Sequence, residues 1–232
     1  MCAHTVQVST DTIAGMPNKD TNDESIVAHF SDGKLMEFSK EETIISGLAE
    51  PDGIYLIKSG FVKAYSVSKA GNINLLQIHE AGEFIPLPWA LDGAHTTGLF
   101  YESMTDVAVL RASKDKLRSA MGSDTWLSQE VLKQAVNTIS YYTQRIQTLE
   151  FRTARGRIIA ELLYLAERFG KQHGKEVIIY APITHQDLAD SINMSRETAS
   201  RALEQLFAEG LMGQKEHLFI IQDLPMLQVA LS

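Results

Sequence analysis

The chain has 232 residues, of which 44% are hydrophobic and 22% charged, and its formal net charge at pH 7 is −8. This composition is typical of one large or two ordinary globular domains, and no apolar run approaches the roughly 18 residues that a transmembrane helix needs. The N-terminus lacks the basic and apolar regions of a secretory signal, so we expect a cytoplasmic protein. Cys2 is the only cysteine, which excludes an internal disulfide framework and any multi-cysteine zinc or iron–sulfur site.

The first part of the chain divides into a polar arm and a region rich in short strands. Residues 1–24 are polar and aperiodic, which predicts a flexible arm, and one helical turn is expected from Ile26 to Phe30. Residues 25–121 alternate short apolar runs with turns, the pattern of a β-sandwich or barrel. The predicted strands are Leu35–Phe38, Thr43–Ile45, Ile54–Lys58, Phe61–Val67, Ile73–His79 and Val107–Arg111.

A long helix is predicted over residues 122–150, with Ser123 or Asp124 as its N-cap. Apolar side chains recur in it at alternating steps of four and three residues, which is the spacing of a coiled-coil seam. The predicted dimer seam consists of Leu132, Val136, Ile139, Thr143 and Ile146. The same spacing also fits a helix that packs only on its own domain, and the residues alone leave both interpretations open.

Residues 151–232 are predicted to form a second domain. Phe151–Phe169 continues the helical pattern, the Arg152–Arg157 segment is expected to be a hinge, and Val177–Tyr180 is predicted to be a strand. This part holds 9 Lys and Arg against 10 Asp and Glu, whereas residues 1–150 hold 12 against 19. The second domain is therefore nearly neutral, which predicts weak non-specific affinity for nucleic acid and dependence on a few placed cations.

The segment Pro182–Met212 is predicted to form two short helices joined by a tight turn. Thr184 is a candidate N-cap, and Asp187 follows it at the position of a capping-box acid. Asn193 suits the turn because Asn tolerates left-handed backbone, and Ser195 is placed to cap the second helix. This arrangement is typical of a helix-turn-helix, whose second helix enters the major groove of DNA.

The second helix has two different faces. Its outward arc carries Arg196, Glu197, Ser200, Arg201 and Glu204, and its opposite arc carries Ala199, Ala202, Leu203 and Leu206. Arg pairs bidentately with guanine and Glu accepts from the cytosine amino group, so the outward arc is suited to reading bases. Taken alone, Glu197 and Arg201 also fit an ordinary i,i+4 pair on a solvated helix. The apolar segment after Gly210 is predicted to form a two-stranded wing, with Lys215 and His217 near its tip.

The stretch INMSRETASRALEQLFAEGLM resembles the recognition helix of the CRP/FNR (catabolite activator) superfamily of bacterial transcription regulators. Its S-R-E-T-x-x-R run stands here as Ser195, Arg196, Glu197, Thr198 and Arg201. The earlier stretch IYLIKSGFVKAYSVSKAGNINLLQIHEAGEFI resembles the jelly-roll effector domain of the same superfamily. The matching positions there are Ile57, Gly60, Val62, Lys63, Tyr65, Gly82 and Glu83.

The resemblance implies an α+β protein with an N-terminal β-roll of the cyclic-nucleotide-binding type, a long dimerisation helix and a C-terminal winged helix-turn-helix. It implies a homodimer on a palindromic operator with TGA-containing half-sites, with RNA polymerase as a further partner if the protein is an activator. Arg196 and Arg201 would each read a guanine and Glu197 a cytosine, while Ser200 matches a variant that prefers a thymine beside that core. The expected phosphate contacts are Thr184, Gln186, Ser195, Thr198 and Lys215.

The sensor segment departs from the members that bind cyclic AMP. Those members carry a short helix and an Arg-Ser pair after the Gly-Glu turn, but here Pro86 and Pro88 stand at the expected helix start and His95–Gly98 stands where the Arg is expected. We therefore expect no cyclic AMP binding and predict a small organic effector in the β-roll. The candidate pocket residues are Glu83, Phe84, Leu87, Trp89, Thr96, Thr97, Leu99 and Tyr101, which would also suit an ordinary core.

Two alternatives are kept beside this interpretation. A haem-based gas or redox sensor of the same superfamily would need an axial ligand from His29, His79 or His95, although no cofactor is required by the sequence. A cupin-like metal enzyme would use His79, Glu83 and His95, but the H-x-H spacing of that class is absent and an enzyme would not explain the recognition helix. We therefore expect a DNA-binding regulator without catalytic or metal-binding residues.

Overall fold

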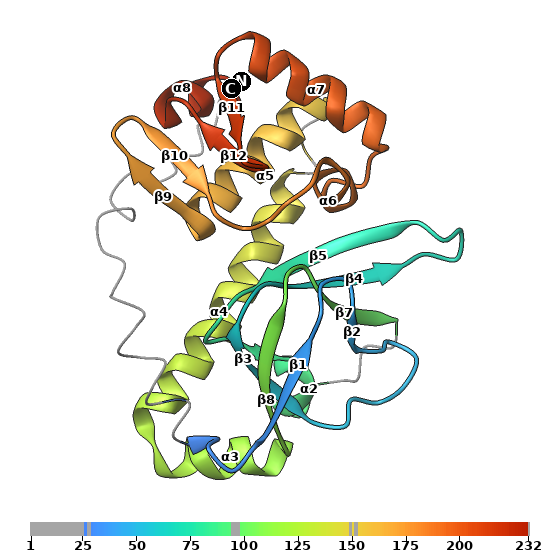
Figure 1. The fold of residues 1–232 in the computed structure, drawn as a ribbon, viewed down its shortest axis with the longest axis vertical. Helices are drawn as coiled ribbons and strands as arrows, with labels where there is room; N and C mark the ends of the chain where they lie inside the picture. The colour runs from blue at the N-terminus through green and yellow to red at the C-terminus, as the bar shows by residue number, and fades with distance from the viewer. Residues whose placement is uncertain (1–25, 27–28, 94–97, 149, 151–152, 232) are drawn as a thin grey trace.

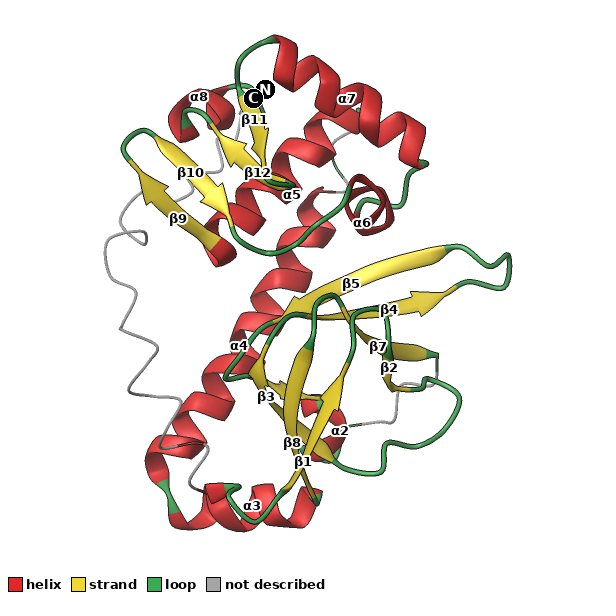
Figure 2. Cartoon of the chain, viewed as in Figure 1, coloured by secondary structure: helices red, strands yellow, loops and turns green. Residues whose placement is uncertain are grey.

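The computed structural model describes residues 26, 29–93, 98–148, 150 and 153–231. They form a β-rich lobe, a long helix and a C-terminal lobe (Figures 1 and 2). The first lobe contains β1 (Lys34–Phe38), β2 (Thr43–Ile45), β3 (Ile54–Ser59), β4 (Val62–Val67), β5 (Ile73–His79), β6 (Phe84–Ile85), α2 (Leu87–Ala90), β7 (Leu99–Ser103), β8 (Val107–Ala112) and α3 (Lys114–Ser123). The long helix is α4 (Thr125–Thr148). The second lobe contains α5 (Ala154–Phe169), β9 (Gly170–His173), β10 (Glu176–Ile179), α6 (His185–Ser191), α7 (Arg196–Ala208), β11 (Met212–Lys215), β12 (Leu218–Ile221) and α8 (Leu224–Val229).

The β-rich lobe is built from two antiparallel four-stranded sheets, in the orders β1-β8-β3-β6 and β2-β7-β4-β5. One apolar cluster joins them: Ile57 and Val109 come from the first sheet, and Ala64 and Tyr101 from the second. Alternation along each strand sends every second side chain into this cluster, as in a β-sandwich. The predicted fold class, with its N-terminal β-roll, is confirmed.

Most of the predicted strands are present, and two of them, β2 and β5, have the predicted bounds. β6, β7, α2 and α3 were not predicted. The expectation that Pro86 and Pro88 replace the short helix was wrong, because α2 forms at this position with a proline in its first turn. The first turn of a helix does not need the missing N–H of proline and suits its fixed φ angle.

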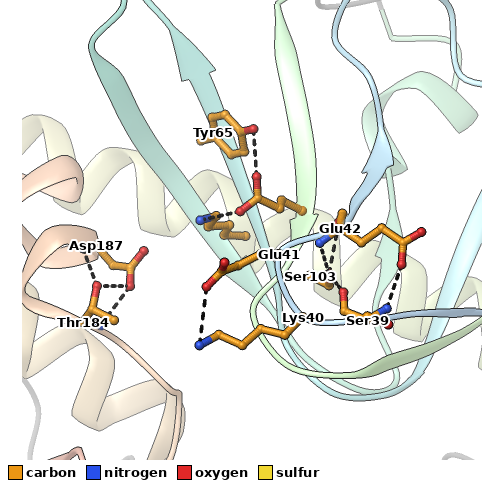
Figure 3. A network of polar contacts seen from close by, with 10 residues as sticks. Ser39, Lys40, Glu41, Glu42, Tyr65, Ser103, Thr184 and Asp187 are labelled. Carbon is orange, nitrogen blue, oxygen red and sulfur yellow. Dashed lines mark hydrogen bonds and ion pairs between the residues drawn. The ribbon is translucent and has the colours of Figure 1, made fainter.

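A turn between β3 and β4 requires glycine. Gly60 has φ +87°, and a Cβ added to it would lie 2.3 Å from the carbonyl oxygen of Asp106. The backbone of the loop before β8 therefore approaches this turn too closely for any side chain. The Ser103 hydroxyl closes the adjacent corner by donating to the Ser39 carbonyl at 2.5 Å (Figure 3).

Helix α4 begins where a carboxylate caps it. The Asp124 side chain accepts from the backbone N–H groups of Trp126 and Leu127 at 2.8 and 3.2 Å. Asp124 is one of the two predicted N-caps, whereas Ser123, the other, and Gly122, where the predicted range began, belong to α3. At about 1.5 Å per residue, α4 is long enough to run beside the whole β-roll and reach the second lobe (Figure 1).

The two long faces of α4 differ in their exposure to solvent. The inner face buries Leu127, Val131 and Tyr141. On the outer face the predicted seam is open to solvent: Leu132 is 63% exposed and Ile139 is 65% exposed. Isolated apolar side chains on a surface are ordinary, whereas an apolar stripe along one helix marks an interaction surface.

The second lobe starts at a capped helix rather than within a hinge. Thr153 caps α5 by accepting from the Gly156 N–H at 3.1 Å, so Ala154–Arg157, which the predicted hinge included, is helical. The antiparallel sheet β11-β12-β10-β9 lies beside α5. Its β11–β12 hairpin is the predicted wing, and β9 was not predicted.

Candidate DNA-binding surface and its junction with the β-roll

Helix α6 starts at the predicted capping box. The Thr184 hydroxyl oxygen accepts from the Asp187 N–H at 3.1 Å, and the Thr184 N–H donates to the Asp187 carboxylate at 2.9 Å (Figure 3). Both side chains thus serve backbone groups that would otherwise lack partners at the helix end. The direction of α6 is set by this local pairing.

The turn and the second helix also follow local rules. Asn193 adopts φ 55°, in the left-handed region that Asn tolerates. Ser195 then caps α7 by accepting from the Thr198 N–H at 3.2 Å. Ala189 and Ala199 are fully buried between α6 and α7, and their small size lets the two helices cross closely. The predicted helix-turn-helix is confirmed.

Helix α7 lies at the end of the molecule that is remote from the β-roll (Figure 1). Arg196, Glu197 and Arg201 are exposed, and Ser200 is half-buried. Leu203 and Leu206 are fully buried on the other side. The structure therefore brings the four predicted base-reading residues onto one accessible face.

The predicted phosphate contacts surround this face. Thr184, Gln186 and Lys215 are exposed, and a shallow hollow lies between the start of α6, the start of α7 and the wing. The hollow is lined by Ile183, Thr184, His185, Gln186, Arg196, Gln214 and His217. Ser195 and Thr198 are exposed beside it, and their hydroxyls lie 2.9 Å apart. Three of the residues that line the hollow, Ile183, His185 and Gln214, were not predicted as part of the site.

The predicted effector residues are distributed over two apolar clusters. Phe84 and Leu87 are buried with Trp89 packed against them, in the cluster that α3 and α4 cover. Tyr101 is buried in the cluster between the two sheets, with Leu99 at its edge. Thr96 and Thr97 lie outside the described residues, so the structure does not place them.

Two family models match the chain. The model of the cyclic nucleotide-binding domain matches residues 35–124, and that of the Crp-like helix-turn-helix domain matches residues 156–230. A CRP-like cAMP-activated global transcriptional regulator of Mycobacterium tuberculosis is 26% identical over 189 residues, which make up 81% of this chain and 84% of that relative. The chain belongs to the CRP/FNR superfamily of transcription regulators.

Solved structures share the same fold. A mutant of CooA from Carboxydothermus hydrogenoformans has a TM-score of 0.75 at 19% identity, with 88% of this chain and 90% of that chain covered. FixK2 from Bradyrhizobium japonicum has a TM-score of 0.70 at 21% identity, with 85% and 96% covered. Among the described residues, no helix combines the length and the apolar character needed to cross a membrane.

In this CRP/FNR regulator, the Gly-Glu turn of the β-roll is bonded to the DNA-binding lobe. Arg168 of α5 donates to one carboxylate oxygen of Glu83 at 2.5 Å, and Nδ1 of His79 lies 2.8 Å from the other. Burial alone would raise the pKa of Glu83, but Arg168 and His79 outweigh it and hold the pKa at about 2. The carboxylate is therefore ionised and fully engaged between the two lobes.

A second guanidinium connects three parts of the fold. Arg145, near the end of α4, donates to the carbonyl oxygens of Leu75 and Leu76 in β5 at 2.6 and 3.1 Å. It also donates to the Ser191 carbonyl at the end of α6. Because one side chain bonds α4, the β-roll and the helix-turn-helix, movement of any one of them changes its bonds to the others.

We call the contacts of Glu83, His79, Arg168 and Arg145, with the side chains packed around them, the lobe junction. Apolar contacts complete it. Tyr141 of α4 stacks on Tyr164 of α5, with ring centroids 4.1 Å apart. Leu75, Ile78 and Met104 of the β-roll are buried in the same cluster as the core of the second lobe. The two lobes therefore share one core.

Sequence reasoning missed both arginines of the junction. A signal for Arg145 was nonetheless present, because Leu127, Val131, Gln134, Thr138, Tyr141 and Arg145 form a second stripe with steps of four and three residues. Gln134 on this stripe bonds both the N–H and the carbonyl of Phe84, at 3.0 and 2.8 Å. Bonding of a side chain to a strand backbone has no sequence signature, so the polar residues of the stripe resemble those of a solvated surface.

Replacing Glu83 by Gln should lower the free energy of unfolding by about 3 kcal/mol at pH 7, because it leaves the Arg168 guanidinium buried without its counter-charge. The folded-state pKa of Glu83 is depressed, so this stabilisation is present above the unfolded pKa and is lost as the pH falls from 4.5 towards 2. Urea unfolding at equal protein concentration would measure the difference. The double variant Glu83→Gln/Arg168→Met should lose less than the sum of the single variants, and additive losses would contradict the pairing.

Proposed function

We propose that this CRP/FNR regulator acts as a homodimer in the cytoplasm and binds a palindromic operator with TGA-containing half-sites. The observation that carries the proposal is the outward arc of α7, where Arg196, Glu197 and Arg201 are exposed on a helix whose other side is buried. These side chains match the hydrogen-bonding groups of guanine and cytosine in the major groove. The neutral second lobe requires that such placed contacts, rather than net charge, supply most of the specific affinity.

The outer stripe of α4 supports the dimer. Its side chains at Leu132, Val136, Ile139 and Ile146 are 50–68% exposed. Packing two copies of this stripe about a two-fold axis would bury them and place the α7 helices for half-sites about 34 Å apart. The twofold symmetry of the protein then matches that of a palindrome.

The effector is proposed to be a small organic molecule other than cyclic AMP. In the structure the carboxylate of Glu83, one of the candidate pocket residues, is bonded to Arg168 and His79. An effector in the β-roll would act through the lobe junction, since Glu83 and Phe84 are the points where the sensor turn contacts Arg168 and Gln134. RNA polymerase is a partner if the protein activates transcription.

Selection of bound sequences from random DNA, with and without cell extract, tests the operator and the need for an effector. On the selected operator, Arg201→Ala should reduce discrimination at its guanine by about 1–3 kcal/mol, because a bidentate pair is removed. Lys215→Ala is the matched control: it removes a phosphate-binding cation from the wing and should weaken binding to all sequences alike. Titrations of operator and random duplexes would separate the two effects. Equal losses on both duplexes for Arg201→Ala would contradict its assignment to a base.

Ile139→Asp should convert the dimer to a monomer, because it buries a carboxylate at the centre of the apolar seam. Operator affinity should fall by about 100-fold or more, since two linked recognition helices bind far more tightly than one. Sedimentation would report the assembly state and gel shift the affinity. Asn137→Asp adds the same charge to an exposed position outside the stripe and should change neither. A dimeric Ile139→Asp protein would show that another surface pairs the chains.

Calorimetry with cyclic AMP should show no binding at micromolar ligand. The mycobacterial relative is described as cAMP-activated, so this titration discriminates between the two possibilities for the sensor lobe. The variant Arg168→Met should be measured beside the wild type, because it frees the Glu83 carboxylate while retaining an apolar side chain. Micromolar binding to the wild type would overturn the exclusion of cyclic AMP, and its appearance in Arg168→Met alone would show that the lobe junction occupies a nucleotide site.

A further inference from the structure

His185, at the start of α6, contacts the Ser200 side chain on the outward arc of α7. Its Nδ1 lies 3.1 Å from the Ser200 hydroxyl oxygen of α7. Its ring stacks on Phe219 of the wing strand β12, with centroids 5.7 Å apart and an angle of 21° between the planes. The ring is thus fixed by the wing on one face and directed at a single hydroxyl.

Ser200 occupies a distinct place on α7. Glu197 and Arg201 on the same arc are exposed, whereas Ser200 is half-buried beside His185. A serine hydroxyl rotates freely and can donate one hydrogen or accept through its lone pairs. A bond to a fixed imidazole removes part of that freedom, and the ring nitrogen determines which role remains for a partner in the major groove.

We propose that His185 is a positioning residue that determines whether the Ser200 hydroxyl offers a hydrogen or a lone pair to the base that it faces. The inference rests on the proposed function, because it requires α7 to lie in the major groove. It adds to that function a specificity determinant on α6, outside the recognition helix.

The consequence for base choice follows from the two states of Nδ1. When Nδ1 carries no hydrogen it accepts from Ser200, and the hydroxyl oxygen can then only accept from a base donor such as cytosine N4. When the imidazole is protonated, Nδ1–H donates to Ser200, and the hydroxyl hydrogen is free for a base acceptor such as thymine O4. Protonation of the Nε2–H tautomer of His185, in which Nδ1 is the acceptor, therefore favours thymine at this position.

The groups around the ring set the pH range of the change. Burial lowers the pKa of His185, Arg196 of α7 lowers it further, and Glu204 of α7 opposes them. From the wing, His217 lines the same hollow, and Phe219 contributes only an apolar face. DNA phosphates brought near the hollow would favour the imidazolium and raise the pKa in the complex. The preference for thymine should thus grow as the pH falls.

Two substitutions separate the stacking of the His185 ring from the hydrogen bond of its Nδ1. His185→Phe keeps the stacking on Phe219 but has no nitrogen, whereas His185→Asn keeps a polar group near the position of Nδ1 and does not titrate. The probes are selected operator duplexes that carry thymine or 5-methylcytosine at the base beside the TGA core. These two pyrimidines share the methyl group and differ in whether position 4 is an acceptor or a donor. Affinities for both would be measured from pH 8 to pH 5.5, with His217→Gln as the control for the second imidazole.

In the wild type and in His217→Gln, the ratio of the affinity for the thymine duplex to that for the 5-methylcytosine duplex should rise about three- to tenfold as the pH falls. This is the range expected for one hydrogen bond. His185→Asn should keep discrimination between the bases without pH dependence, and His185→Phe should lose both. A wild-type pH profile in His185→Phe would overturn the proposal. So would an unchanged ratio in Ser200→Ala, and in that case the guanine preference tested by Arg201→Ala would still stand. Absence of any operator preference in the wild type would instead overturn the proposed function itself.

Discussion

The structure depends on one helix, α4, whose inner face packs on the rest of the chain and whose outer face is open to solvent. The inner stripe of α4 ends at Arg145, which bonds β5 and the last carbonyl of α6, and Gln134 holds the backbone of Phe84. The outer stripe is apolar and exposed. A displacement of the Gly-Glu turn against α4 would therefore change the position of the helix-turn-helix on its own β-roll and, in the proposed dimer, the angle at which two chains meet.

The Glu83–Arg168 pair helps to fix the position of the β-roll relative to the second lobe. A buried ion pair adds little net stability compared with apolar packing, but breaking it on one side is costly because the remaining charge is stranded. The pair is therefore better suited to defining one arrangement of the lobes than to strengthening the fold. The shared apolar core around Leu75, Ile78 and Met104 supplies the cohesion, and the ion pair supplies the specificity of the contact.

Local chemistry made the helix-turn-helix predictable. Thr184 and Ser195 accept from backbone N–H groups three residues further along the chain, and Asn193 acts through its own left-handed backbone, so these roles follow from the local sequence. The β-roll was harder to predict from the sequence. The aromatic residues of β7 suit a binding pocket and a core equally, and a proline such as Pro88 can begin a helix as well as prevent one. The contacts of Arg145, Arg168 and His185 were not predicted, because each reaches a residue at least 15 positions away that only the folded chain brings near.

Because the second lobe is nearly neutral, its affinity for DNA would depend strongly on the orientation of the recognition helix. Where a strongly basic surface holds DNA non-specifically, tilting a recognition helix removes only part of the affinity. Here the outward arc of α7 carries the cations Arg196 and Arg201, and the wing carries Lys215. The acidic side chains of Glu197 and Glu204 lie on the same arc. In the proposed dimer, binding would require that both α7 helices meet their bases together. A small change at the lobe junction would then suffice to weaken binding, so an effector would control DNA binding through only a few bonds.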